Sequence, residues 1–175
     1  MQKQLAVLAL FAVTASWTVL ADPPKPLKVT ETIEINAPVA KVWAAIKDYD
    51  SLNKWHPGFA KDEIVKGSNN TPGAVRALTI KDGPTFTEEL VAFSEKDHTY
   101  QYRIIESPLP LKDYVATVSV KKGNDGMTVV TWVGHFKRKN PADNPPEAES
   151  DAGAVNLIRG VYQSGLANLK KQLEG

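Results

Sequence analysis

The chain has 175 residues, a formal charge of +1 at pH 7 and no cysteine. This length suits one domain with a substantial core, and the lack of cysteine excludes disulfides and thiol chemistry. Binding to phosphate backbones needs a basic surface, which a nearly neutral chain does not provide. We therefore expect no nucleic-acid partner.

Residues 1–21 have the pattern of a secretory signal peptide. Lys3 precedes an apolar stretch, and Val19 and Ala21 occupy the −3 and −1 positions of a signal-peptidase site. The pattern predicts export to a bacterial periplasm with cleavage after Ala21, which leaves no membrane span in the mature protein. The alternative is a membrane anchor that is kept, although the apolar stretch is slightly short for a span of about 20 residues.

The first part of the mature chain predicts a tether, a strand and two short helices. Residues 22–28 contain three prolines, which favour an extended tether, and a single domain covers 29–175. Residues 29–35 alternate as a strand does, with Val29 and Ile35 on one face. Pro38 is suited to the start of a helix, and a second short helix follows up to Trp55.

The middle of the chain predicts a series of strands joined by short turns. Asp82-Gly83 is a strong hairpin signal. Consecutive strands with such short connections are mostly antiparallel. With residues 29–35 they make seven strands; the others are expected at residues 64–65, 74–80, 86–93, 98–106, 114–120 and 127–136.

The last stretch, from about Glu147 to Leu173, predicts one long helix. Apolar residues recur there at steps of three and four, acidic residues stand at its start, and Lys170 and Lys171 stand at its end. Such a helix would be roughly 40 Å long, enough to cross a small domain. The element order is of the α+β class, and we expect a curved antiparallel sheet that grips this helix.

Four loose motifs lie at residues 37–43 (APVAKVW), 55–57 (WHP), 73–76 (GAVR) and 132–136 (WVGHF). Together with the order of elements, they resemble the START-like or Bet v 1-like superfamily of helix-grip proteins, of the polyketide cyclase/dehydrase and lipid-transport type. The resemblance implies a ligand cavity between sheet and helix. An exported member of this size also resembles the MxaD subgroup, which implies periplasmic methanol dehydrogenase and its cytochrome c acceptor as partners.

Two charged residues are predicted to face each other inside the sheet. If the turn at Asp82-Gly83 places Ile80 opposite Pro84, then Arg76 lies opposite Glu88 on an apolar face. One interpretation is a structurally neutral buried pair. The second is a pair that lines the cavity and orients the polar end of a ligand, and the third is a shifted register that exposes both side chains.

Alternation also predicts which side chains point toward the helix. They form a large aromatic and apolar surface, which fits either plain core packing or the wall of a small-molecule pocket. Tyrosine hydroxyls and the glycines at 153, 160 and 165 favour a pocket, because glycine leaves room beside the helix. The candidate ligand-binding residues are Trp55, His56, Arg76, Leu78, Phe86, Glu88, Tyr100, Tyr102, Tyr114, Trp132, Leu157 and Val161.

Signals for catalysis, metals and cofactors are weak. The chain has three histidines, none at a metal-ligand spacing with a second ligand, and no phosphate loop or nucleophile motif, so we expect neither metal nor cofactor. Of the three, His56 is the candidate for a functional role, as a general base, a cavity contact or a plain loop residue.

Two functions remain in view. The first is a non-catalytic binding or accessory protein for a small hydrophobic molecule. The second is an enzyme of the polyketide cyclase or dehydratase kind, with His56, Arg76, Glu88 and Tyr102 around an enolisable substrate. The lack of a clear acid–base pair and the leader peptide favour the first.

Overall fold

The structure, a computed structural model, describes residues 24–175, so the predicted signal peptide lies outside the described residues. Within residues 24–175, no helix has both the length and the apolar character needed to cross a membrane. The elements are β1 (Leu27–Ile35), α1 (Val39–Ile46), α2 (Leu52–Trp55), β2 (Phe59–Lys66), β3 (Val75–Ile80), β4 (Thr85–Ser94), β5 (Thr99–Glu106), β6 (Leu111–Lys122), β7 (Thr128–Arg138), the 3₁₀ turn η1 (Glu147–Glu149) and α3 (Asp151–Glu174).

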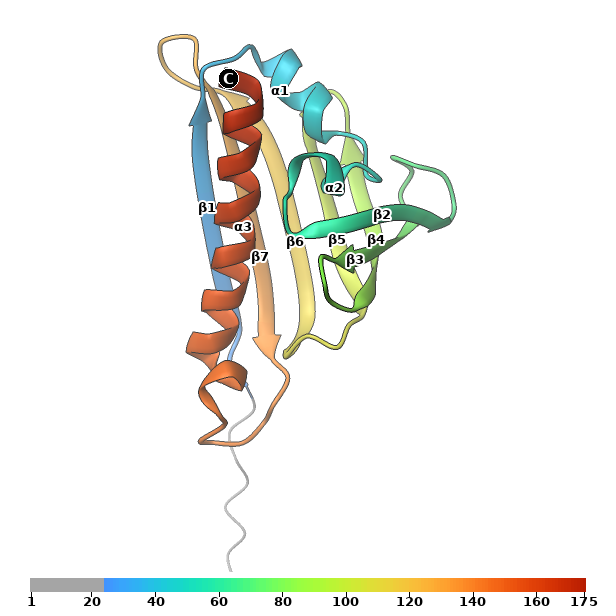
Figure 1. Ribbon diagram of the computed structural model, residues 1–175, viewed down its shortest axis with the longest axis vertical. Coiled ribbons are helices and arrows are strands. Elements are labelled where there is room, and N and C mark those ends of the chain that lie inside the picture. The colour runs from blue at the N-terminus through green and yellow to red at the C-terminus, as the bar shows by residue number, and fades with distance from the viewer. Residues whose placement is uncertain (1–23) are drawn as a thin grey trace, which may run out of the picture.

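The seven strands form one antiparallel sheet in the order β1-β7-β6-β5-β4-β3-β2. The sheet twists so strongly that β2 runs almost across the direction of β1 (Figure 1). The long helix α3 lies along β1 and β7, while α1 and α2 lie over the other half of the sheet. This arrangement confirms the predicted α+β helix-grip fold with two short helices after the first strand.

Three element boundaries differ from the prediction. The final helix begins at Asp151 rather than near Glu147, because Ser150 caps it by accepting a hydrogen bond from the Gly153 N–H (3.0 Å), and Glu147–Glu149 forms a separate 3₁₀ turn. Strand β1 begins at Leu27, within the expected tether. Strand β2 begins at Phe59, five residues before the predicted strand at 64–65.

Helix α3 packs closely on the sheet through aromatic side chains. Tyr162 stacks on Trp132 of β7, with ring centroids 4.2 Å apart. A Cβ atom at Gly134 would overlap the Tyr162 hydroxyl, so this position must be glycine for the helix to lie at its present distance from the sheet. The residues that α3 buries are Ala154, Ile158, Tyr162, Gly165, Leu166 and Leu169.

The expectation that the helix glycines leave open space is wrong at two of the three positions. Gly165 is in contact with the His56 ring, and a Cβ there would overlap it; Gly153 touches the backbone of η1 in the same way. Only Gly160 has open space, and it faces solvent. Gly153 and Gly165 therefore serve close packing of the chain rather than the volume of a cavity.

These contacts predict opposite effects for two glycine-to-alanine substitutions in one helix. We expect Gly165→Ala to lower the free energy of unfolding by about 1–3 kcal/mol, because the new methyl group must displace His56. Gly160→Ala should raise it by about 0.5–1 kcal/mol, because alanine is the better helix former and nothing is in the way. Urea unfolding of both variants measures this, and equal effects would contradict it.

Candidate functional site

The structure contains a cavity of about 200 Å³ between α3 and the sheet. Its wall comes from the first half of α3, the start of α2, the loop between α2 and β2, and strands β2 to β7 with the β5–β6 connection. The residues that line it are Leu52, His56, Gly58, Phe59, Ile80, Phe86, Glu88, Tyr102, Ile104, Leu109, Tyr114, Trp132, Leu157, Ile158 and Val161. Nearly all of these are apolar or aromatic, which is typical of a small-molecule site.

Most of the predicted ligand-binding residues lie on this wall. They are His56, Phe86, Glu88, Tyr102, Tyr114, Trp132, Leu157 and Val161. Leu157 lies at the mouth and is 37% exposed. Their role in binding stays a prediction, but their position at one cavity is a feature of the structure.

Four predicted site residues are buried but do not line the cavity: Trp55, Arg76, Leu78 and Tyr100. Trp55 packs on Trp132, with ring centroids 5.6 Å apart, and Tyr100 packs on Tyr49 under α1. Arg76 is turned toward other charged groups, and Leu78 is fully enclosed. Arg76, Leu78 and Tyr100 share the inward face of the sheet with the cavity residues, so alternation alone could not separate core from wall, and Trp55 is the last residue of α2.

Sequence reasoning missed several wall residues. Ile80 and Ile104 were on faces predicted to point inward, so the signal for them was present. Phe59 and Gly58 belong to a loop and strand start that the sequence did not define, and Leu109 lies in the β5–β6 connection. Side chains from loops depend on how distant segments meet, which local periodicity does not describe.

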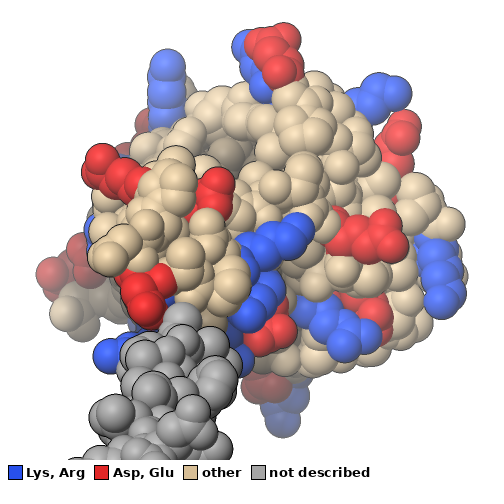
Figure 2. All heavy atoms as spheres, turned by 90° about the horizontal axis from the view of Figure 1, so that it is seen from below, with Lys and Arg blue, Asp and Glu red and all other residues tan. Residues whose placement is uncertain are grey.

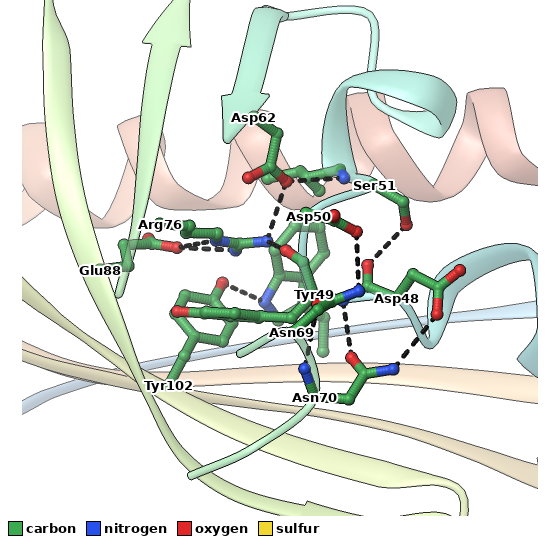
Figure 3. A network of polar contacts seen from close by, with 12 residues as sticks. Asp48, Tyr49, Asp50, Ser51, Asp62, Asn69, Asn70, Arg76, Glu88 and Tyr102 are labelled. Carbon is green, nitrogen blue, oxygen red and sulfur yellow. Dashed lines mark hydrogen bonds and ion pairs between the residues drawn. The ribbon is translucent and has the colours of Figure 1, made fainter. Parts of the chain in front are cut away.

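The predicted pairing of Arg76 with Glu88 is confirmed. The two residues are opposite each other in the β3–β4 register, and both side chains are buried. Arg76 Nε and Nη2 both donate to Glu88 Oε2, at 2.9 and 2.6 Å (Figure 3). The shifted register is therefore excluded, and of the two residues Glu88 alone reaches the cavity wall.

A second carboxylate, which the sequence analysis did not predict, completes this cluster. Asp62 on β2 accepts a hydrogen bond from Arg76 Nη1 (3.3 Å) and another from the backbone N–H of Leu52 at the start of α2 (2.9 Å). Arg76 Nη1 also donates to the carbonyl oxygen of Tyr49 (2.6 Å), and its guanidinium lies over the Tyr49 ring at 4.1 Å. One cation thus faces two carboxylates.

Burial determines the protonation behaviour of both carboxyls. It raises the pKa of Glu88 and of Asp62, while the charge of Arg76 acts in the opposite direction. For both carboxyls, the loss of hydration thus changes the pKa more than the ion pair with Arg76 does. A ligand or proton that neutralises this cluster would relieve that cost.

Aromatic polar groups form a connected chain along another side of the wall. Trp132 Nε1 donates to the Tyr102 hydroxyl (2.9 Å), which lies 3.4 Å from the Tyr114 hydroxyl. The Tyr114 hydroxyl shares a hydrogen bond of 2.5 Å with that of Tyr162 on α3. Burial raises the pKa of each of these tyrosines, so they remain neutral hydrogen-bonding groups.

His56 joins the α2 end of the cavity to α3. Its Nε2 lies 2.8 Å from the carbonyl oxygen of Val161, and its Nδ1 accepts a hydrogen bond from the Gly58 N–H (3.0 Å). A carbonyl only accepts and a backbone N–H only donates, so the neutral imidazole with its proton on Nε2 satisfies both. Burial lowers the pKa of His56, and both nitrogens are occupied, so it has no free lone pair for use as a general base.

Acidic and basic side chains are mixed on the face of the molecule drawn in Figure 2. Seen from below, basic and acidic side chains are interspersed around an uncharged area, with no extended basic patch in this view (Figure 2). Within the part of the chain that the structure describes, no group of three or more potential metal ligands lies close enough to hold an ion.

The sheet, the gripping helix and the enclosed apolar cavity define the helix-grip class of START-like proteins. The family model described as "Polyketide cyclase / dehydrase and lipid transport" matches residues 26–174. The chain belongs to this family.

Two curated relatives are plant receptors. Abscisic acid receptor PYL10 of Arabidopsis thaliana is 29% identical over 117 residues, which are 65% of this chain and 63% of the receptor. Abscisic acid receptor PYL2 of the same plant is 26% identical over 104 residues, 57% of this chain and 54% of the receptor. The chain thus spans little more than half of the length of these relatives.

Solved bacterial structures match more of the chain. The protein XoxI from Bacillus cereus is 31% identical with a TM-score of 0.72, over 83% of this chain and 94% of its own. An uncharacterised protein from Bacillus thuringiensis has the same identity and a TM-score of 0.73, over 85% of this chain and 100% of its own. A protein from Nitrosospira multiformis is 27% identical with a TM-score of 0.70, over 84% and 96% of the two chains.

The environment of His56 predicts a pH-dependent contribution to stability. The pKa of His56 is lowered in the folded protein. The contribution of His56 to the free energy of unfolding is therefore complete above the pKa of the unfolded state, about 6.5. It is lost as the pH falls below that value, by at most about 1.4 kcal/mol per pH unit. We expect the stability difference between wild type and His56→Gln in urea unfolding to shrink from about pH 7.5 to pH 5.

Comparison with the variant is needed because the raised pKa values of Asp62 and Glu88 act in the opposite direction in the wild type. His135→Gln, at an exposed position on β7, is the matched control for the loss of a histidine. Parallel profiles for wild type and His56→Gln would show that the buried imidazole makes no such contribution.

Proposed function

We propose that this protein binds a small hydrophobic molecule in the cavity between α3 and the sheet, and that it acts without catalysis. The observation that carries the proposal is the cavity of about 200 Å³ with its apolar and aromatic wall. An engineered cavity of about 150 Å³ in another protein holds benzene, so this volume suits a ligand with roughly eight to ten non-hydrogen atoms. The description of the family, which includes lipid transport, supports a binding role.

The names of the curated relatives support the same proposal. Both are receptors for abscisic acid, a small molecule, and their similarity to this chain extends over more than half of it. A receptor or carrier needs a ligand-sized interior rather than an acid–base pair. The cavity of this chain meets that requirement.

The alternative of a polyketide cyclase or dehydratase is less well supported by the site. It needs His56, Arg76, Glu88 and Tyr102 around one substrate. Both His56 nitrogens are hydrogen-bonded to backbone groups, and Arg76 does not line the cavity. Of the three that line the cavity, His56 is thus already hydrogen-bonded, which leaves Glu88 and Tyr102. The Tyr102 hydroxyl already accepts a hydrogen bond from Trp132.

We further propose that the protein is exported and assists periplasmic methanol dehydrogenase and its cytochrome c acceptor. The support for export is the signal-peptide pattern of residues 1–21, with cleavage after Ala21. The support for the partners is the resemblance to the MxaD subgroup. In this role the protein would help the two redox partners interact rather than transform a substrate.

The binding proposal predicts that filling the cavity mouth blocks ligands. Indole is a neutral apolar probe of suitable size, and we expect calorimetry to show that it binds the wild type. Leu157→Trp should weaken binding by about tenfold or more, because the larger side chain occupies the mouth.

The matched control for this test is Val91→Trp. Val91 is similarly exposed, at 40% against 37% for Leu157, and it does not line the cavity. We expect this control to bind indole as the wild type does. Equal binding of indole by the two variants would show that indole does not bind in this cavity.

The export and partner proposal predicts where the mature protein is found and with what. We expect the protein in the periplasmic fraction of its source cells, with Asp22 as its first residue by mass spectrometry. Pull-down from that fraction should recover methanol dehydrogenase and cytochrome c. An intact leader would contradict export, and the absence of both redox proteins would contradict the partner assignment while leaving ligand binding untouched.

A further inference from the structure

The cavity has one polar atom that the protein leaves available. Both hydrogen bonds from Arg76 to Glu88 end on Oε2, and among the described residues no hydrogen bond reaches Oε1 (Figure 3). The other polar side chains at the wall are satisfied: His56 by two backbone groups, and Tyr102 and Tyr114 by the chain of aromatic hydroxyls. A ligand with a polar end would therefore find its partner at Glu88.

Arg76 can balance one of the two carboxylates in this cluster, but not both. Arg76 is the single cation that contacts Asp62 and Glu88, so the cluster has one negative charge in excess when both carboxyls are ionised. No lysine or arginine of the described chain lines the cavity. A buried uncompensated charge is costly, and a positively charged ligand group would compensate for it.

The rest of the wall also suits a cation. Five aromatic residues line the cavity together with Glu88: Phe59, Phe86, Tyr102, Tyr114 and Trp132. The faces of aromatic rings attract cations, and aromatic walls with a carboxylate are a recurring way to bind organic ammonium groups. The same rings bury the apolar body of such a ligand.

We propose that the cavity selects a small organic cation, an ammonium group on an aryl or alkyl body of roughly eight to ten non-hydrogen atoms, with its charged end at Glu88 Oε1. The proposal rests on the proposed binding function and adds the class of ligand. Carboxylate ligands should bind most weakly, because their charge would face that of Glu88 in a site without a second cation.

The test is a series of ligands of nearly equal shape, measured by calorimetry near neutral pH. The probes are 2-phenylethylamine, which is an ammonium ion there, 2-phenylethanol and phenylacetate, with indole as the neutral reference. We expect the amine to bind about tenfold or more tightly than the alcohol, and the acid to bind most weakly. An alcohol or acid that binds as tightly as the amine would overturn the assignment.

A pair of variants locates the effect. Glu88→Gln should remove the preference for the amine while indole still binds, whereas Glu89→Gln should keep the preference, because Glu89 pairs with Arg103 outside the cavity. An amine preference that survives Glu88→Gln would overturn the role of Glu88. If Glu88→Gln does not fold, the wild-type ligand ranking decides alone.

The two levels of the proposal fail in different ways. Binding of indole without any preference for the amine overturns the ligand class but leaves the binding function in place. Binding of none of the four probes overturns both.

Discussion

The buried guanidinium of Arg76 is the interaction on which the rest of the site depends. From β3 it binds Glu88 on β4, Asp62 on β2 and the carbonyl oxygen of Tyr49 between α1 and α2. Removal of one partner of a buried ion pair leaves a charge without compensation, which costs several kcal/mol, so these segments are held in one arrangement. Asp62 extends the constraint, because it also binds the first turn of α2 at the Leu52 N–H.

The cavity follows from this constraint and from the way α3 is attached. The Arg76 cluster fixes α2, the loop after α2 contributes His56, and His56 binds the carbonyl oxygen of Val161 on α3. On the other side, the Tyr162 hydroxyl and ring connect α3 to β6 and β7. The space between these two attachments is enclosed by side chains whose polar groups are already hydrogen-bonded, with Glu88 Oε1 as the exception.

The sequence predicts the sheet, the helices and most of the cavity wall, because these depend on periods of two and 3.6 residues. The turn at Asp82-Gly83 was enough to place Arg76 opposite Glu88. Asp62 escaped prediction because β2 contains two register shifts, which break the alternation from which a face is deduced. The role of Gly165 escaped it because His56, which fills the space beside it, comes from a distant part of the chain.

Gly134 and Gly165, the two glycines at the contacts of α3, set the position of the helix independently of the volume of the cavity. Both glycines leave room for the side chains of Tyr162 and His56 and thereby fix the distance between α3 and the sheet. Neither glycine lines the cavity. Exchanges among Ile80, Ile104 and Leu109 could therefore enlarge, shrink or reshape the hollow without shifting the scaffold. A protein built in this way can change its ligand selectivity through single substitutions at the cavity wall, and each substitution leaves the fold unchanged.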